Sequence, residues 1–203
     1  MTPLLLVVNH HIMGIISKFV SNYHTLSPSS LKEFENLFQK KNYKKNDVIY
    51  RTGESTSRFF ILYEGLTRSV VIDKNGKHKT RTLFNAPAIF ASLFSSLNNE
   101  PSVAEFNCLT DVILFEGNFL KFIELTEKHH DISILYNRFL EEAFINMEEK
   151  ATILSTLDAT ERYVHLKNKI PNIENLIQLN HIASYLNITS IQLSRIRKKM
   201  FSQ

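Results

Sequence analysis

Four cationic side chains lie close together near the C-terminal end of the chain. Arg195, Arg197, Lys198 and Lys199 fall within five residues, and no acidic residue follows Thr189. Because guanidinium and ammonium groups displace the counterions of a phosphate backbone, such a run predicts a phosphate polymer as its partner. The alternative is a solvent-exposed helix whose basic last turn complements its own dipole.

The residues before this basic run have the pattern of two short helices joined by a tight turn. Each segment offers one apolar face at helical spacing. The apolar positions are Ile182, Leu186, Leu193 and Ile196. Ala183 is small enough for the two helices to cross closely, and Asn187 tolerates the left-handed backbone that ends the first helix. Thr189 and Gln192 have the spacing of a capping box at the start of the second helix.

Together these features predict a helix-turn-helix between Leu179 and Arg197. In that motif the second helix enters the major groove of double-stranded DNA, and basic side chains near it contact the backbone. Arg197, Lys198 and Lys199 are the predicted phosphate contacts.

Composition and charge agree with this interpretation. The chain has 203 residues, 43% of them hydrophobic, which is enough for one large domain or two small ones. Its net charge of +4 comes from the C-terminal segment, since Lys plus Arg and Asp plus Glu are equally numerous before residue 158. A positive C-terminal unit fits an anionic polymer.

The single cysteine and the N-terminal segment bear on the compartment. Cys108 cannot form an internal disulfide or a four-thiolate cluster, so we expect a reducing, cytoplasmic location. The apolar run from Leu4 to Val8 follows no basic residue and is too short to span a membrane, so we expect neither a signal peptide nor a membrane anchor.

The chain divides by pattern into four segments. Residues 1–12 precede any clear pattern and form an N-terminal extension, with Met13 as an alternative start. Residues 13–130 form a β-barrel with flanking helices, because the region from Asp47 to Phe115 consists of short β-branched and aromatic runs punctuated by glycine. Asn75-Gly76 predicts a hairpin with a primed turn, and Ser30 with Glu33 predicts a helix N-terminus.

Residues 131–157 predict one long helix with an apolar seam. Its positions alternate at three- and four-residue intervals. They are Tyr136, Leu140, Ala143, Met147, Lys150, Leu154 and Leu157, of which all but Lys150 are apolar. A seam of this kind predicts pairing with a second copy of the chain, and the alternative is that this face packs on the strand domain. Residues 158–203 form the DNA-binding unit, which begins at a capping box of Asp158 and Glu161.

This order of parts resembles the Crp/Fnr family of bacterial transcription regulators. The resemblance covers roughly Lys40 to Lys199. The stretches that carry it are Lys45 to Glu54, Phe60 to Gly65, Ile182 to Leu186 and Leu193 to Arg197. It implies an α+β fold: a jelly-roll barrel of the cyclic-nucleotide-binding type that senses a signal, a long dimerisation helix and an all-α helix-turn-helix domain. It also implies a homodimeric, non-enzymatic regulator that binds double-stranded DNA and meets RNA polymerase.

The resemblance assigns roles on the second helix. The family's three principal base-reading positions fall on Ser190, Ile191 and Arg195. Of these, Arg195 alone can make a bidentate contact with guanine, whereas Ser190 bonds any base and Ile191 can touch a thymine methyl. The positions where the family contacts phosphate fall on Gln178, Asn180, Thr189 and Gln192.

The chain departs from the family at its ligand cassette. Members that bind cyclic nucleotides carry a Gly-Glu pair and an Arg-Ser-Ala run, whose Arg pairs with the cyclic phosphate. Ser92 and Pro101 stand where the Glu and the Arg would be. A phosphate there would lose a charge-assisted contact worth roughly 1.5 to 3 kcal/mol, so we expect no gating by cyclic AMP.

The cassette instead offers uncharged hydroxyls. Ser92, Ser95, Ser96 and Ser102 supply them, and Asn146 on the long helix is expected to face them. The predicted effector pocket comprises Ala91, Ser92, Leu93, Pro101, Ser102, Val103 and Asn146. The alternative is a surface loop over a vestigial pocket. The sequence identifies no effector.

Other chemistries lack the residues they need. Iron–sulfur clusters require several cysteines, and haem would have to use one of His78, His129, His130 and His165, none of which has a distinguishing context. No paired metal ligands, nucleophile elbow or phosphate loop is present, so we expect no metal, cofactor or enzymatic activity. The competing hypothesis is a ligand- or protein-binding barrel that has lost sequence-specific DNA binding.

Overall fold

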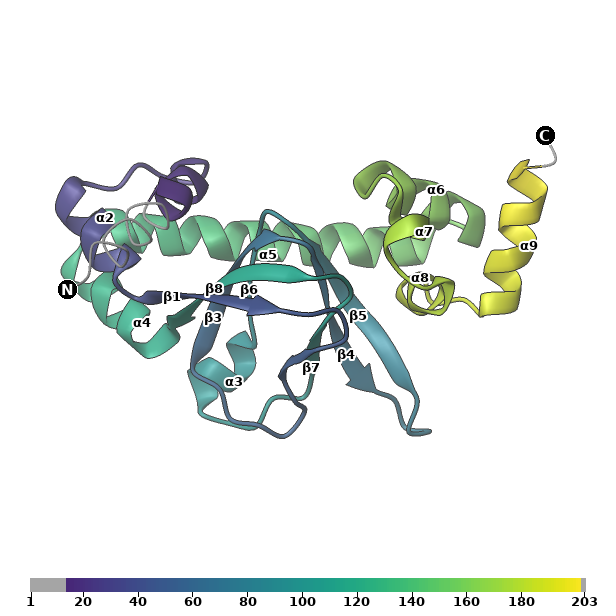
Figure 1. Ribbon diagram of the computed structural model, residues 1–203, viewed down its shortest axis with the longest axis horizontal. Coiled ribbons are helices and arrows are strands. Elements are labelled where there is room, and N and C mark those ends of the chain that lie inside the picture. Colours follow the sequence, from purple (N-terminus) through teal and green to yellow (C-terminus); the bar gives the residue numbers. More distant parts are fainter. Residues whose placement is uncertain (1–13, 202–203) are drawn as a thin grey trace.

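The computed structural model describes residues 14–201, so the predicted extension at residues 1–12 lies outside the described residues. The molecule is elongated along one long helix, α5 (His130–Thr156). Figure 1 shows a β-barrel on one side of this helix, short helices at one end of it and a helical unit at the other. The α+β architecture predicted from the sequence is therefore confirmed.

The barrel consists of two four-stranded antiparallel sheets. The first has the order β1 (Phe38–Tyr43), β8 (Val112–Asn118), β3 (Arg58–Glu64) and β6 (Ala88–Ala91). The second has the order β2 (Val48–Tyr50), β7 (Glu105–Cys108), β4 (Leu66–Ile72) and β5 (His78–Asn85). In this order every pair of neighbouring strands except β4 and β5 is distant in sequence, which matches the predicted jelly-roll. It leaves β5 at the edge of its sheet.

Aromatic rings fill the space between the two sheets. The Tyr50 and Phe106 rings stack with centroids 4.6 Å apart, and Phe90 stacks on both Phe60 and Phe84 at 5.0 and 4.9 Å. Parallel rings at this spacing leave little room between the sheets, so the barrel interior is a packed core.

A second aromatic core lies between the first sheet and the helices that cover it. The helices α2 (Pro28–Glu35) and α4 (Phe119–Lys128) and the start of α5 contribute to it, together with the helical residues 14–21. Phe122 lies 5.0 Å from Phe59 and 5.5 Å from Phe34 between ring centroids. The first half of α5 is thereby anchored to the barrel.

Two local predictions in the barrel domain need correction. The N-cap of α2 is Ser27 instead of Ser30, because Pro28 occupies the first turn and the Ser30 hydroxyl donates to Asp131 Oδ1 at 2.7 Å. The hairpin between β4 and β5 is present, but its turn is not a primed one. Of the turn residues 73–77, Gly76 alone has a positive φ, so Asn75 does not adopt the conformation that a primed turn requires.

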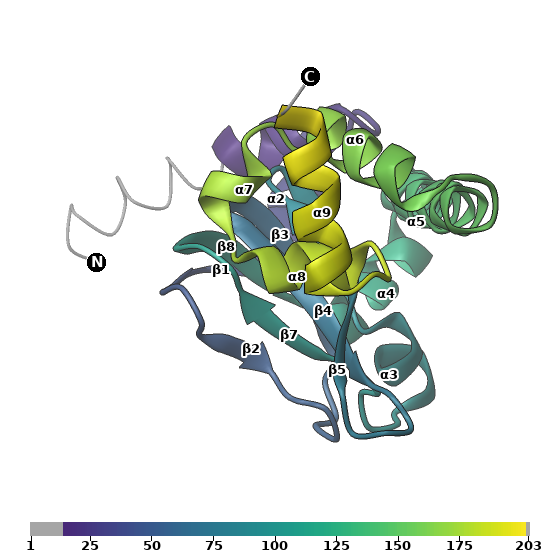
Figure 2. The same ribbon diagram turned by 90° about the vertical axis from the view of Figure 1, so that its right-hand side faces the viewer.

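In the part of the C-terminal unit that the structure describes, four helices pack around a buried core that also includes Leu66 and Leu109 of the barrel domain. The helices are α6 (Ala159–Lys169), α7 (Ile173–Leu176), α8 (Leu179–Tyr185) and α9 (Ser190–Phe201). The Asp158–Glu161 capping box opens α6, as predicted. Asn187 ends the α8 segment with a φ of 56°, also as predicted. Figure 2 looks onto this end of the molecule and shows α8 and α9 crossing steeply.

Candidate nucleic-acid interface

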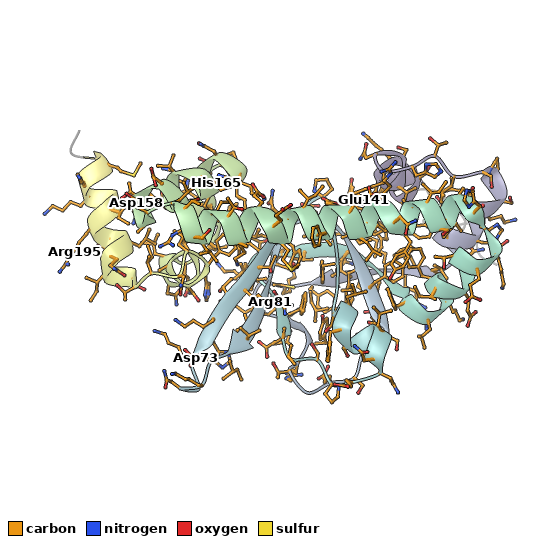
Figure 3. All side chains as sticks on the ribbon, turned by 180° about the vertical axis from the view of Figure 1, so that it is seen from behind. Asp73, Arg81, Glu141, Asp158, His165 and Arg195 are labelled. Atoms are coloured by element: carbon orange, nitrogen blue, oxygen red, sulfur yellow. The ribbon has the colours of Figure 1, made fainter. Side chains whose placement is uncertain are left out.

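The packing of α9 on α8 decides which of its side chains reach solvent. Leu193 is fully buried, and Ile196 packs on the same core. The three predicted base-reading residues, Ser190, Ile191 and Arg195, are exposed, and Ile191 is 66% exposed. Arg195 extends away from the body of the molecule (Figure 3). All three are therefore placed where a duplex could reach them.

The start of α9 is closed by the predicted capping box. The backbone N–H of Gln192 donates to Thr189 Oγ1 at 3.1 Å, and the backbone N–H of Thr189 donates to Gln192 Oε1 at 2.9 Å. In both side chains the bonded oxygen acts as an acceptor, so the Thr189 hydroxyl proton and the Gln192 NH₂ group can still donate to a phosphate. Gln178 and Asn180, the other predicted phosphate contacts, are exposed at the start of α8.

Arg197 occupies a different environment from the two lysines that follow it. Its Nε lies 2.5 Å from Glu174 Oε1, and the Tyr163 hydroxyl donates to the same oxygen. Burial raises the pKa of Glu174, but the Tyr163 hydrogen bond and the charges of Arg197 and Lys167 outweigh it and hold the pKa below its usual value. The ion pair of Arg197 with Glu174 thus joins α9 to α7 within the C-terminal unit.

Arg197 therefore differs in exposure from Lys198 and Lys199, the two residues predicted with it to contact phosphate. Lys198 and Lys199 are exposed, whereas Arg197 is half-buried. Arg197 follows the buried Leu193 by four residues, which puts it on the core face of α9. That spacing was available from the sequence and could have distinguished the arginine from the lysines.

The predicted dimer seam is partly exposed and partly used within the chain. Residues 141–148 of α5 are all exposed, including Ala143, and Met147 is 64% exposed. Leu154 is exposed and Leu140 is half-buried. Tyr136, however, packs on the core between the first sheet and the helices that cover it, because its ring contacts Phe122 edge-on with centroids 5.4 Å apart.

The heptad pattern also missed a large apolar side chain on the exposed face of α5. Phe144 is 61% exposed and follows Leu140 by four residues. At helical spacing Phe144, Leu140 and Met147 share one face. Lys150, assigned to the seam from spacing, instead donates to the Arg81 carbonyl of β5. The exposed apolar face is therefore centred on Phe144 and Met147.

The predicted effector pocket is closed by its own hydroxyls. Ser92 and Ser102 are buried, with their Oγ atoms 2.9 Å apart, and Ser102 donates to the Ala104 carbonyl at 2.8 Å. Ser95 and Ser96, at the helix α3 (Leu93–Asn98), donate to the carbonyls of Glu100 and Thr56. Each of these serine hydroxyls thus has a hydrogen-bond partner within the barrel domain.

The remaining pocket residues do not converge on these serines. Pro101 and Val103 are exposed, and Ala91 and Leu93 are half-buried. Asn146 is exposed on α5, where its amide donates to the Glu142 carbonyl, so the expectation that it faces the serines is not supported. Arg58, which lies over the Tyr50 ring, is paired with Glu116 at 3.4 Å.

The C-terminal unit is held against the barrel by α8. Arg68 Nη1 on β4 lies 2.7 Å from His181 Nδ1, and the Thr80 amide on β5 donates to Ser184 Oγ at 2.9 Å. The pKa of His181 is lowered to about 4 by burial and then by the charges of Arg68 and Lys45. The imidazole is therefore neutral when docked and accepts from Arg68.

Acid should weaken this contact. An undocked His181 binds a proton near its ordinary pKa of 6.5, while the docked ring resists protonation until about pH 4. Docking therefore loses stability as the pH falls through this window. The free energy of unfolding can be measured by chemical denaturation above pH 6.5 and again between pH 6.5 and 4. It should fall more for the wild type than for His181→Gln. Equal losses would mean that His181 does not titrate at this contact.

Comparison with known proteins assigns the barrel. Residues 40–129 match the family of cyclic nucleotide-binding domains. The barrel is therefore similar to a cyclic nucleotide-binding domain. A comparison with curated proteins found no significant match.

Solved structures share the fold of nearly the whole chain. FixK2 from Bradyrhizobium japonicum is 16% identical, with a TM-score of 0.69 over 82% of this chain and 85% of its own. The c-di-GMP-responsive global regulator CLP of Xanthomonas campestris is 13% identical, with a TM-score of 0.68 over 87% and 92%. The catabolite activator protein of Thermus thermophilus is 16% identical, with a TM-score of 0.54 over 89% and 86%. The predicted Crp/Fnr fold is confirmed.

The cassette of this barrel lacks the two side chains expected to bind a cyclic nucleotide. The position expected to hold the phosphate-binding cation is Pro101, and the position expected to hold the ribose-binding carboxylate is the buried Ser92. A nucleotide would have to displace the Ser92–Ser102 hydrogen bond and bury its phosphate without a matching cation.

No helix within residues 14–201 is long and apolar enough to cross a membrane.

Proposed function

We propose that the chain is a homodimeric, DNA-binding transcription regulator of the Crp/Fnr type that does not respond to cyclic AMP. The observation that carries the proposal is the exposed face of α9. Ser190, Ile191 and Arg195 lie on it, opposite the buried Leu193, and Lys198 is exposed beside them. The shared fold with known regulators supports the same function.

Each exposed group has a defined task in this proposal. Arg195 reads a guanine through two hydrogen bonds, Ile191 packs on a thymine methyl, and Ser190 bonds a base edge without strong preference. Lys198, Lys199, Gln178 and Asn180 contact phosphates and set the register. With a single guanidinium at the bases, the half-site should be less rich in G and C than one read by several arginines.

The dimer places two copies of α9 on one duplex. Two half-sites about 34 Å apart, one helical turn, are what a twofold dimer reads. The exposed apolar face of α5, centred on Phe144 and Met147, supplies the pairing surface. RNA polymerase is a further expected partner, because a regulator bound at a promoter lies beside it.

Selection of bound sequences from a random duplex library tests the proposal. The purified protein should enrich a twofold-symmetric site whose half-sites lie one helical turn apart. Enrichment of an asymmetric site would contradict the dimer. If no sequence is enriched over the starting library, the chain is not a sequence-specific DNA-binding protein.

Cyclic nucleotides should not bind the unaltered protein. Calorimetry with cyclic AMP and cyclic GMP is expected to show no heat of binding up to about 1 mM, an affinity that corresponds to only about 4 kcal/mol. The reason is the missing cation at Pro101 together with the buried Ser92–Ser102 hydrogen bond. Micromolar binding of either nucleotide would overturn the interpretation of the cassette.

A further inference from the structure

The helix α8 makes contacts on two of its faces. Ile182, Ala183 and Leu186 are buried in the core of the C-terminal unit. His181, Ser184 and Tyr185 follow the helical spacing of a second face and contact the barrel or α5. Because α8 is packed on both sides, its orientation depends on the barrel as well as on its own domain.

Ser184 of this second face contacts the edge strand β5. Edge strands leave backbone groups without partners in the sheet. Here the Thr80 amide donates to Ser184 Oγ of α8 at 2.9 Å, and the Arg81 carbonyl accepts from Lys150 of α5. In Figure 3 Arg81 lies on the strand that passes beneath α5. The edge thus joins the barrel to both helices.

The guanidinium of Arg68 is itself held in place. Its Nε donates to Asn107 Oδ1 at 2.8 Å, and its Nη1 donates to Thr80 Oγ1 at 3.2 Å. The same Nη1 lies 2.7 Å from His181 Nδ1. A guanidinium fixed by two barrel residues gives His181 a defined docking position.

Lys150 of α5 also contacts α8, through the ring of Tyr185. Its Nζ lies 4.4 Å from the centroid of the Tyr185 ring. The long helix, the barrel edge and α8 therefore meet at one place, so a shift of α8 has to break contacts with all of them.

The direction of α9 follows from this contact. Leu193 and Ile196 pack α9 on the core that contains α8, so the two helices move together. The chain connects α5 to α6 through Leu157 and Asp158, which are both in extended conformation. Leu66 and Leu109 also pack against the C-terminal unit, and Lys169 pairs with Glu149 of α5 at 2.7 Å. Loss of the polar contacts of α8 would therefore change the angle of the unit at Leu157 and Asp158 without releasing it.

We infer that His181 and Ser184 are positioning residues that select which half-site spacing the dimer reads. By docking α8 on Arg68 of β4 and on Thr80 of β5, they hold the two α9 helices of a dimer at one separation and one angle. A duplex whose half-sites match that separation is bound by both copies without moving either. This inference rests on the proposed DNA-binding function.

The test measures affinity for duplexes whose two half-sites are spaced in single-base-pair steps, together with a duplex that holds one half-site. Wild type should prefer one spacing. His181→Lys, which sets an ammonium against Arg68, and Ser184→Ala, which removes the acceptor for Thr80, should each reduce that preference by about tenfold, as loss of one such hydrogen bond does. Affinity for the single half-site should stay unchanged.

Two controls separate positioning from a general loss of structure. His181→Gln keeps a neutral acceptor for Arg68. Its affinity should therefore depend on half-site spacing as that of the wild type does. Hydrogen exchange at the Thr80 amide should accelerate in Ser184→Ala without DNA, because that amide loses its acceptor.

The possible results have distinct meanings. A spacing profile in His181→Lys and Ser184→Ala that equals that of wild type would overturn the inference, as would tighter binding at every spacing, since the contact would then be inhibitory. Unchanged exchange at Thr80 in Ser184→Ala would show that the contact does not form in solution. If wild type binds no duplex at any spacing, the proposed function fails, and the inference falls with it.

Discussion

Met147→Lys is expected to produce monomers that lose most of their specific affinity for DNA. Met147 lies on the exposed apolar face of α5, and a lysine there would bury an ammonium against its symmetry mate. A monomer binds one half-site at a time, so affinity for the full site should fall by about 10² to 10⁴. Sedimentation and binding to the full site measure the two effects.

Ile145→Lys is the matched control for this substitution. Ile145 is 61% exposed, close to the 64% of Met147, but lies two residues earlier and so on the opposite side of the helix. It should leave the dimer intact. Dissociation by Ile145→Lys with a stable Met147→Lys dimer would place the interface on the other side of α5.

Arg195→Ala is expected to weaken specific binding by about 1 to 3 kcal/mol and to relax the preference at one symmetric position of the site. Lys198→Ala should weaken binding to all sequences alike and lower the salt dependence by about one phosphate contact per subunit. Binding to the selected site and to unrelated duplexes at several salt concentrations separates the two. If both variants weaken specific and non-specific binding equally, Arg195 does not read a base.

Arg197→Ala provides a matched arginine for the same experiment. Because Arg197 pairs with Glu174 within the C-terminal unit, its loss should lower the free energy of unfolding and leave the base preference unchanged. If Arg197→Ala instead changes the base preference at a second position of the site, Arg197 contacts DNA.

The local features of the C-terminal unit could be predicted because their causes are local. The capping boxes at Asp158 and at Thr189 join residues three apart, and the left-handed turn depends on Asn187 alone. The buried positions Ile182 and Leu193 follow helical periodicity. Interactions within four residues need no knowledge of the rest of the fold.

Predictions that depended on distant partners failed where the partner could not be known. Ser30 was expected to cap a helix, but its hydroxyl reaches Asp131, about a hundred residues away. Asn146 was expected to face the serine cassette, yet it bonds its own helix. Tyr136 has the spacing of a seam residue, but the rings of α4 cover it. Periodicity gives the face of a helix without saying what lies against that face.

The sequence by itself determined the order of barrel, long helix and paired short helices, since these follow from local hydrophobic patterns, caps and turn residues. It also determined the missing cation at Pro101, which is a matter of residue type. The tertiary structure alone decided that Ser92 and Ser102 bond each other, that Glu174 holds Arg197, and that His181 and Ser184 dock on β4 and β5. Each of these contacts joins residues that only long-range packing brings together.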